Sequence, residues 1–211
     1  IPTTLLAMVD ASVGGKTGIN FNGLKNEIGV FSPAEYVLTE TEFLKTLDTQ
    51  NLLSGYAEML KHGLISTTRH WAELLNFDMN HIDYKMLQTL VAESVQIKEN
   101  IVEQDPFEKG IRKALNLGHT VGHAFESLAL ETNRPVLHGY AVAWGIVCEL
   151  YFSYLKVGFP KDKLRQTITI DVLQPLFENW INSIMEDKTI QYNVKAPKIV
   201  SVSNLRLGNG G

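Results

Sequence analysis

The sequence has almost no cysteine, since Cys148 is the single thiol among 211 residues. One thiol cannot form an internal disulfide, and this composition is typical of the reducing cytoplasm. Long apolar runs are also lacking, because the longest, residues 140–148, ends at Glu149 and is too short to span a membrane. The chain opens with Ile1-Pro2, without a methionine or a signal peptide, so either a start was removed or this is an internal fragment. We expect a cytoplasmic protein that makes no membrane contact.

A large excess of charge of either sign is absent too. The 23 acidic and 19 basic side chains give a formal net charge of -4, which argues against a general nucleic-acid binder. Hydrophobic residues make up 45% of the chain and charged residues 20%, which is ordinary for a globular protein. A chain of this length has room for one large domain or two small ones, with a buried core.

The glycine turn at residues 11–18 carries only part of a nucleotide-binding motif. Residues 15–17 read Gly-Lys-Thr, the end of a phosphate-binding P-loop, but the first glycine of that motif would fall at Asp10. The preceding segment is also rich in helix formers, whereas a P-loop follows a buried strand. These two features argue against an ATPase. Lys16 remains a candidate ligand for another oxyanion, and the alternative is a plain glycine turn with a solvated lysine.

Hydrophobic periodicity divides the chain into a mixed start and a helical remainder. Residues 1–50 combine an apolar segment, the glycine turn and a second turn at residues 20–23. From residue 51 onward, apolar side chains recur at steps of three and four residues, which is typical of amphipathic helices. We therefore predict a mostly α fold. The predicted elements are a strand at 35–39, helices at 40–47, 51–64, 84–103, 115–130, 139–157 and, weakly, 168–185, and a hairpin within 190–202.

Lys98 stands at a position where an apolar residue is expected. It follows Val91 by seven residues and precedes Ile101 by three, inside the apolar stripe of the helix at 84–103. A lysine on that face either extends its amine to the edge of the core or points into a polar cavity. The pattern leaves both interpretations open.

Two histidines share one helix face. His119 and His123 are four residues apart, a spacing that suits a divalent metal. A zinc-protease motif would need a glutamate directly after the first histidine, where this chain has Thr120, so that class is disfavoured. Gly118 and Gly122 weaken the helix and suggest that another segment packs close to this backbone. The alternative is a pair of surface histidines on an amphipathic helix.

A carboxylate, a lysine and a further histidine complete the candidate set. Glu58 and Lys61 are three residues apart and form either a simple salt bridge or a metal ligand beside an anion-binding cation. His138 enters an apolar helix, where a histidine can also be an ordinary core residue. Two histidines, one carboxylate and an open coordination position make a catalytic zinc set. The sequence leaves the choice of histidines open among His62, His119, His123 and His138.

The chain resembles the 3-dehydroquinate synthase family from residue 1 to about residue 165. The resemblance rests on the segments IPTTLLAMVDASVGGKTGIN, GLKNEIGVF, SGYAEMLKHGL, GIRKALNLGHTVGHAFE and LHGYAVAWG, which occur in the order found in the family. It implies a lyase of the shikimate pathway, and so of chorismate and aromatic amino acid biosynthesis. Such an enzyme converts DAHP, a seven-carbon keto-sugar acid phosphate, to 3-dehydroquinate and phosphate. The resemblance also implies bound NAD, Zn2+ or Co2+, and a homodimer.

The resemblance implies a domain division and a role for each matching residue. Residues 1–50 would be the C-terminal remnant of an α/β Rossmann-like NAD-binding domain, and residues 51–168 a helical metal- and substrate-binding domain. Residues 169–211 match the family weakly. The implied metal ligands are Glu58, His119 and His138. The implied substrate-binding residues are Asp10, Lys16, Asn26, Lys61, Lys98, Arg112, Asn116 and His123, of which Lys16, Lys61, Lys98, Arg112, Asn116 and His123 are also catalytic. The implied cofactor-binding residues are Thr3, Thr4, Asp10, Lys25, Phe43 and Thr46.

The sequence departs from the family pattern at several points. The chain contains no glycine-rich turn of the kind that binds the NAD pyrophosphate. Tyr140 stands where glutamate commonly follows the His-Gly pair, and Lys188 matches the family's phosphate-binding lysine only in part. The alternatives are a related sugar phosphate cyclase, an NAD- and metal-dependent polyol dehydrogenase, and a non-catalytic fragment.

Overall fold

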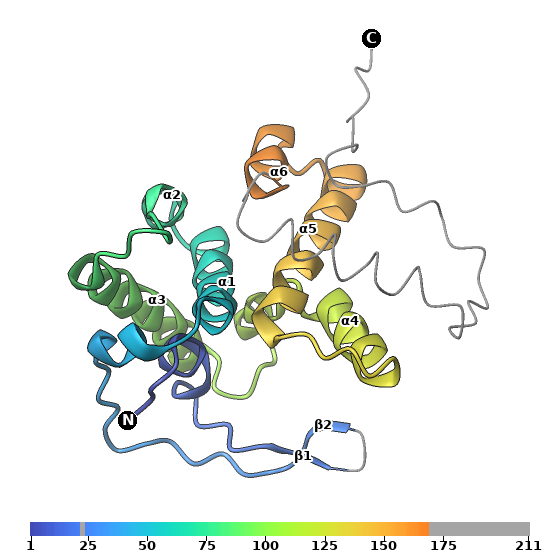
Figure 1. The fold of residues 1–211 in the computed structure, drawn as a ribbon. Helices are drawn as coiled ribbons and strands as arrows, with labels where there is room; N and C mark the ends of the chain where they lie inside the picture. Colours follow the sequence, from blue (N-terminus) through green and yellow to red (C-terminus); the bar gives the residue numbers. More distant parts are fainter. Residues whose placement is uncertain (22–23, 169–211) are drawn as a thin grey trace.

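The computed structural model describes residues 1–21 and 24–168, and for residues 20, 21, 24–27 and 168 it describes only the backbone. The chain is mostly helical, as predicted (Figure 1). The α-helices are α1 (Thr49–Ile65), α2 (Thr68–Asn76), α3 (Tyr84–Gln104), α4 (His119–Glu131), α5 (His138–Val157) and α6 (Lys161–Ile168). Shorter elements are a π-helical turn (Ala7–Ala11), two 3-10 helices (Thr41–Thr46 and Ile111–Asn116), and the strands β1 (Ile19–Phe21) and β2 (Leu24–Ile28).

Helix α1 lies at the centre of the fold, with α2 and α3 on one side and α4 and α5 on the other (Figure 1). All its residues from Leu52 to Gly63 are buried, because neighbouring elements cover several of its faces. The apolar stripe of α1 packs into the main core with α3 and the π-helical turn. The same helix carries Glu58, Lys61 and His62, and these three side chains are buried with it. The centre of the fold therefore holds ionisable groups as well as apolar ones.

Side-chain caps start three of the helices. Asp48 accepts a hydrogen bond from the backbone N–H of Asn51 at 2.9 Å and begins α1. Asp83 accepts from two backbone N–H groups at the start of α3, each at 3.0 Å. Thr67 does the same at α2, accepting from His70 N at 3.2 Å. Each cap satisfies N–H groups that have no partner inside the helix, typically worth about 1 kcal/mol.

Glycines let α4 and α5 approach each other more closely than side chains would allow. A Cβ atom on Gly145 would lie 1.9 Å from the carbonyl oxygen of Gly118, and one on Gly122 would lie 2.9 Å from that of Ala141. A Cβ atom on Gly139 would lie 1.8 Å from the carbonyl oxygen of Ser54 in α1. The start of α5 therefore rests directly on the backbone of α1 and close to the start of α4.

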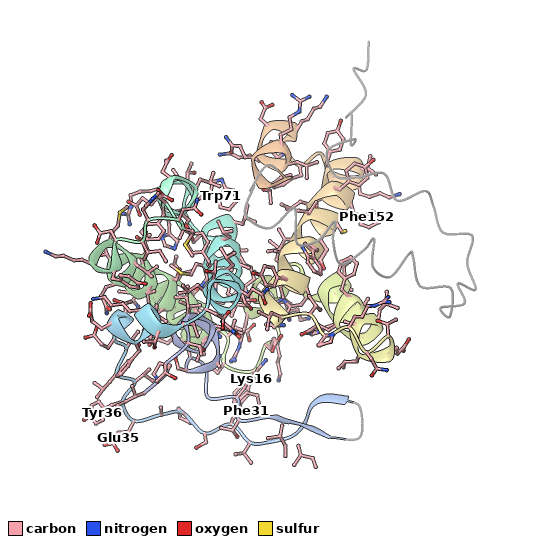
Figure 2. All side chains as sticks on the ribbon, viewed as in Figure 1. Lys16, Phe31, Glu35, Tyr36, Trp71 and Phe152 are labelled. Carbon is pink, nitrogen blue, oxygen red and sulfur yellow. The ribbon has the colours of Figure 1, made fainter. Side chains whose placement is uncertain are left out.

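Most of the helix predictions are confirmed, but two others need correction. The predicted helix at 115–130 begins only at His119, because Gly118 adopts a left-handed φ of 81° and the residues before it form a 3-10 helix. Residues 35–39 are not a strand, and they have no neighbouring strand in the described part of the chain. Tyr36 and Leu38 are both exposed, and Figure 2 shows Tyr36 projecting outward. The regular pairing is instead that of β1 and β2, which are antiparallel, so residues 20 and 21 of the predicted turn belong to a strand.

Two α-helices of the structure were not predicted from the sequence, and two predicted elements lie outside the described residues. The helices α2 and α6 were not predicted as separate elements. The predicted weak helix to residue 185 and the hairpin within 190–202 lie outside the described residues. Among the helices of the described residues, none combines the length and apolar character needed to cross a bilayer.

We predict that Gly139→Ala and Gly145→Ala each destabilise the chain, because the added methyl group would overlap a backbone carbonyl of a neighbouring helix. Overpacking of this kind costs about 1–3 kcal/mol, which lowers the Tm of a chain of this size by roughly 2–12 °C. Thermal unfolding followed by circular dichroism measures the change. Ser127→Ala, at an exposed position of α4, is the control and should leave the Tm nearly unchanged. A Gly139→Ala variant as stable as the parent would contradict the close helix contact.

Candidate metal centre

One carboxylate and two imidazoles from separate helices meet at the centre of the fold. Glu58 comes from the middle of α1, His119 from the first residue of α4 and His138 from the first residue of α5. The Oε1 atom of Glu58 lies 3.5 Å from Nε2 of His138 and 4.0 Å from Nε2 of His119. One candidate ligand atom from each residue lies within 4.8 Å of the other two. Ligands of a single tetrahedral zinc ion, bound at about 2.0–2.1 Å, have similar separations.

The glycine contacts explain why these three side chains converge. Ser54 and Glu58 are four residues apart and share one face of α1. The backbone N–H of Gly139 donates to Ser54 Oγ at 3.0 Å, and the absence of a Cβ lets the two backbones touch. His138, one residue earlier, is thereby held beside Glu58. The approach of α4 to α5 brings His119 to the same point.

Glu58 is fully buried, and its two oxygen atoms differ in their surroundings. Oε2 accepts a hydrogen bond from the buried Lys61. Oε1, which faces the two imidazoles, has no hydrogen-bond partner among the described residues. A buried acceptor without a partner costs about 1–3 kcal/mol, so such atoms in folded proteins usually have a ligand to satisfy them. The free oxygen therefore fits a cation between it and the imidazoles.

Hydrogen bonds orient both histidines toward that point. His138 Nδ1 lies 3.1 Å from Glu126 Oε1, and His119 Nδ1 lies 3.3 Å from the carbonyl oxygen of Leu117. When Nδ1 carries the proton and donates it to these acceptors, Nε2 presents its lone pair toward Glu58. Burial, followed by the charge of Lys61, lowers the pKa of His119 from 6.5 to about 4. The imidazole of His119 is therefore neutral near pH 7, as a metal ligand must be.

The two other candidate histidines lie outside this trio. His123 is half-exposed, and its ring centroid lies 5.4 Å from that of His119 and 6.4 Å from that of His138. Its Nε2 lies 3.8 Å from Glu126 Oε2, so Glu126 stands between His123 and His138. His62 is fully buried on α1, and neither of its ring nitrogens has a hydrogen-bond partner among the described residues.

A second buried ion pair lies beside the trio. Lys98 is buried and its Nζ donates to Asp10 Oδ1 at 2.6 Å, which joins α3 to the π-helical turn. The lysine therefore points into a polar interior, and of the two interpretations open from sequence this is the one the structure supports. Burial by itself would raise the pKa of Asp10, but Lys98 and Lys61 hold that pKa below its ordinary value. Asp10 stays ionised at neutral pH and compensates the ammonium group of Lys98.

Cationic and amide donors gather around the glycine turn. Arg112 is buried, and its guanidinium donates to the carbonyl oxygen of Pro106 at 2.7 Å and to that of Gly14 at 3.5 Å. Lys16 Nζ and Asn116 Nδ2 each lie 2.5 Å from a different oxygen of Glu108. Glu108 adopts a φ of 57°, a strained conformation for a residue with a side chain and one that is common at functional sites.

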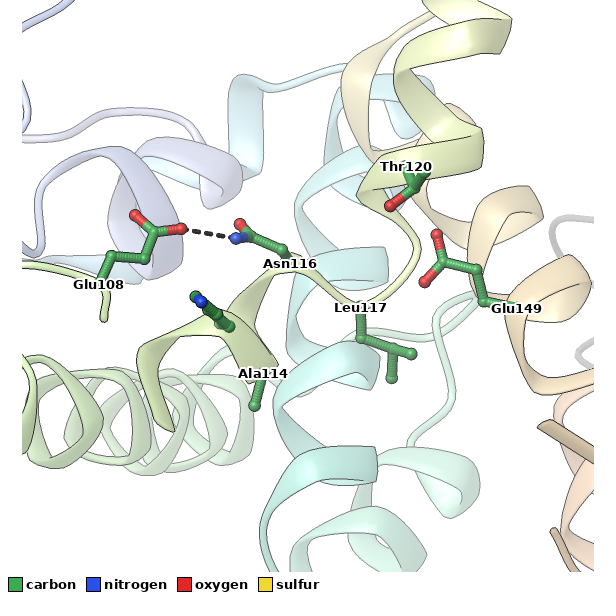
Figure 3. A pocket seen from close by; sticks show the side chains of 7 residues that line it. Glu108, Ala114, Asn116, Leu117, Thr120 and Glu149 are labelled. Carbon is green, nitrogen blue, oxygen red and sulfur yellow. Dashed lines mark hydrogen bonds between the residues drawn. The ribbon is translucent and has the colours of Figure 1, made fainter. Parts of the chain in front are cut away.

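A cavity of about 560 Å3 opens next to these donors (Figure 3). Its volume falls within the range of small-molecule sites. Glu149 reaches across from α5 and accepts hydrogen bonds from the backbone N–H groups of Gly118, at 2.7 Å, and Val121, at 3.3 Å. Asn116 is the predicted substrate residue that lines the cavity, and it is the last residue of the 3-10 helix that carries Arg112. The lining residues are Glu108, Lys113, Ala114, Asn116, Leu117, Thr120 and Glu149.

The predicted cofactor residues do not form a site of their own in the described part of the chain. Thr4 Oγ1 accepts from Ala7 N at 3.2 Å, and Thr46 Oγ1 donates to the carbonyl oxygen of Phe43 at 3.2 Å. Phe43 is partly exposed and Thr3 is exposed. Their role with NAD stays a prediction. The side chains of Lys25 and Asn26 and all of Lys188 lie outside the described residues.

Sequence reasoning missed three carboxylates that organise this region. Glu108 holds Lys16 and Asn116, Glu126 orients His138, and Glu149 caps the start of α4. Glu149 had a visible signal, because it is a charged residue that interrupts an otherwise apolar helix. Glu126 lies one helical turn after His123, so its spacing also placed it near the histidine face. Glu108 had no comparable signal.

The described residues define a helical domain with a candidate centre of one carboxylate and two imidazoles. A family model described as "3-dehydroquinate synthase N-terminal" matches residues 1–54, and one described as "3-dehydroquinate synthase C-terminal" matches residues 55–193. The chain belongs to the 3-dehydroquinate synthase family.

Individual relatives agree with this assignment. A 3-dehydroquinate synthase of Parabacteroides distasonis is 61% identical over 168 residues, which cover 80% of this chain and 48% of the relative. One of Streptococcus pyogenes serotype M5 is 41% identical over 180 residues, which cover 85% of this chain and 48% of the relative. The chain thus spans about half the length of the curated relatives it matches.

Solved structures share the fold. ValA, a 2-epi-5-epi-valiolone synthase from Streptomyces hygroscopicus subsp. jinggangensis 5008 with NAD+ and Zn2+ bound, matches with a TM-score of 0.72 and 25% identity over 86% of this chain and 54% of that one. A 2-deoxy-scyllo-inosose synthase complexed with carbaglucose-6-phosphate, NAD+ and Co2+ has a TM-score of 0.70 and 23% identity, over 91% of this chain and 50% of that one. At this identity the second match supports the fold alone.

We predict that His119→Ala abolishes stoichiometric Zn2+ binding at this centre, because it removes one of the two imidazoles that face Glu58 among the described residues. His123→Ala should retain the ion, since its ring lies outside the trio. Isothermal titration calorimetry with Zn2+ on each folded variant should find one ion fewer per chain in His119→Ala than in His123→Ala, and circular dichroism checks the fold. An equal or larger number of ions in His119→Ala would overturn the ligand set.

We also predict that the metal-free chain loses stability as the pH is lowered from about 6.5 toward about 4. The folded state binds fewer protons than the unfolded state in this window, because burial lowers the pKa of His119 from 6.5 to about 4. This group contributes a slope of at most about 1.4 kcal/mol per pH unit to the free energy of unfolding. Urea unfolding at several pH values measures the slope. His119→Asn removes the titrating group and should give a shallower slope, whereas an unchanged slope would exclude the contribution of His119.

Proposed function

We propose that this chain is the metal- and substrate-binding part of a 3-dehydroquinate synthase, which converts DAHP to 3-dehydroquinate and phosphate. The observation that carries the proposal is the convergence of Glu58, His119 and His138, with Oε1 of Glu58 buried and free of a hydrogen-bond partner among the described residues. Membership of the 3-dehydroquinate synthase family supports the choice of substrate. The proposal includes a role in the shikimate pathway, a cytoplasmic location and a homodimer.

The proposed reaction oxidises a substrate hydroxyl transiently, eliminates phosphate, reduces the ketone again and closes the carbocycle by an intramolecular aldol step. Bound NAD would accept and return the hydride, and a divalent ion would polarise the reacting oxygen as a Lewis acid. ValA, which has the same fold, was solved with NAD+ and Zn2+, and this supports both cofactors. In this chain Glu58, His119 and His138 would hold the ion, with Lys61 fixing the second oxygen of Glu58.

The charged residues around the centre fit a substrate with negative ends. Lys98 and Lys61 are buried close to Asp10, and their desolvated charges interact strongly with an anion in this low-dielectric region. Arg112 and Asn116 stand on the 3-10 helix that borders the cavity, and Lys16 reaches the same carboxylate as Asn116. We propose that these groups bind the phosphate and carboxylate of the substrate.

Glu108 has a defined place in this proposal. It currently accepts hydrogen bonds from both Lys16 and Asn116, so a substrate anion that uses these donors has to take over from Glu108 or share them with it. A carboxylate in that position keeps the two donors aligned and compensates the charge of the half-exposed Lys16. His123, half-exposed and within reach of Glu126, would contact the anion from the other side.

A related sugar phosphate cyclase is the second candidate, favoured by the fold shared with ValA. It would use the same cofactor chemistry on a sugar phosphate without a carboxylate. The polyol dehydrogenase and non-catalytic alternatives are less well supported, because neither needs several cations beside a carboxylate–imidazole trio.

We predict that a protein that contains this chain and has the full length of its relatives releases phosphate and 3-dehydroquinate from DAHP in equal amounts. The isolated chain should show at most weak turnover, since it spans about half the length of its relatives. A coupled phosphate assay with chromatographic detection of the product measures both. Phosphate release from a keto-sugar phosphate that lacks a carboxylate, but not from DAHP, would favour the related cyclase. Accumulation of NADH with a polyol as substrate would favour the dehydrogenase.

A pair of lysine variants provides the matched control for this assay. Lys98→Met removes a buried ammonium group from the anion site and should lower kcat/KM by roughly 10²–10³-fold, as for the loss of one charge-stabilising donor. Lys85→Met, at an exposed position on the same helix, should leave it unchanged. Equal activity of the two variants would exclude Lys98 from the chemistry.

A further inference from the structure

A second group of potential metal ligands lies on the other side of α1 from α4 and α5. His70 and Glu73 are three residues apart on α2, and Glu93 faces them from α3. His70 Nδ1 lies 3.4 Å from Glu93 Oε2 and 4.0 Å from Glu73 Oε2. One candidate ligand atom from each of the three residues lies within 4.8 Å of the other two. These separations are close to the roughly 3.3 Å between neighbouring ligands of a tetrahedral zinc ion.

The imidazole in this group is oriented as a metal-bound histidine usually is. His70 is fully buried, and its Nε2 lies 3.0 Å from Oγ of the buried Ser94. When Nε2 carries the proton and donates it to Ser94, Nδ1 presents a lone pair toward the two carboxylates. Nδ1 is itself buried and makes no hydrogen bond within the described residues. A buried, unsatisfied nitrogen that faces two carboxylate oxygens is an independent sign of a missing ligand.

The neighbouring arginine divides the carboxylate oxygens into two sets. Arg69 donates to Oε1 of Glu73 at 2.8 Å and to Oε1 of Glu93. Both Oε2 atoms are therefore left on the side of His70. Two carboxylates and one guanidinium give this cluster a net charge of -1 with His70 neutral, so it can still attract a divalent cation.

We propose that His70, Glu73 and Glu93 bind a second divalent ion, Zn2+ or Co2+, that fastens α2 to α3. One imidazole and two carboxylates favour these borderline ions over Mg2+ or Ca2+, which prefer oxygen ligands alone. Glu73 and Glu93 are partly exposed, so water reaches the site and completes the coordination. The buried Trp71 follows His70 on α2 (Figure 2), and it anchors the helix against the core on which the site rests.

Zn2+ titration of the His119→Ala chain tests the proposal separately from the first centre. The variant lacks a ligand of that centre and should still bind one ion per chain by isothermal titration calorimetry. Zn2+ should also raise its Tm, because an ion that binds only the folded state stabilises it. Adding Glu73→Gln and Glu93→Gln to this variant should abolish the ion and the shift in Tm. Adding Glu103→Gln, at an exposed position of α3, is the matched control and should change neither.

Arg69→Ala distinguishes an ion site from a simple salt-bridge network. If an ion binds, removing the guanidinium charge and freeing the Oε1 atoms should tighten Zn2+ binding several-fold. If the network alone stabilises the helices, Arg69→Ala should lower the Tm and leave no Zn2+ affinity to improve. The absence of ion binding in His119→Ala, or an ion that persists in the double glutamine variant, overturns the proposal. The first of these results leaves the function proposed for the first centre untouched, whereas the second also contradicts the ligand set assigned to that centre.

Discussion

The close contact of three helix backbones is the constraint on which the rest of the structure depends. Gly139 rests on Ser54 of α1, and Gly145 rests on Gly118 at the start of α4, with no room for a side chain at either glycine. Side chains project along known directions from a helix, so fixing the backbones also fixes where Glu58 and its two imidazole neighbours meet. Packing made possible by glycine, rather than affinity among the polar groups, determines the geometry of the candidate metal centre.

Charge compensation is the second common theme. Each buried cation near the centre has an anionic or carbonyl partner: Lys61 has Glu58, Lys98 has Asp10, and Arg112 has two carbonyl oxygens. Uncompensated ions would be very costly to bury, whereas paired ones remain charged inside the protein. This pairing lets a chain with a net charge of -4 keep a concentration of cationic groups in one region.

The sequence allowed much of the fold to be predicted, for physical reasons that differ between segments. The helices α1 and α3 follow the 3.6-residue period, and α5 is a long segment that is apolar on nearly all sides, so all three were placed within a few residues of their observed ends. The start of α4 was misplaced because the left-handed Gly118 interrupts an apolar pattern that continues across it. Spacing alone could not choose among four histidines, since the choice depends on contacts between residues that are 61 and 80 positions from Glu58 along the chain.

Glu58 gives one oxygen to Lys61 and leaves the other toward the imidazoles. A carboxylate shared in this way acts as an electronic link between two neighbours, because charge drawn toward one oxygen is withdrawn from the other. A cation at the free oxygen would weaken the hydrogen bond to the ammonium group. An anion that attracts the ammonium group would make the free oxygen a stronger metal ligand. The binding of an ion and the binding of an anionic substrate would therefore affect each other's strength through this single side chain, without any movement of the backbone.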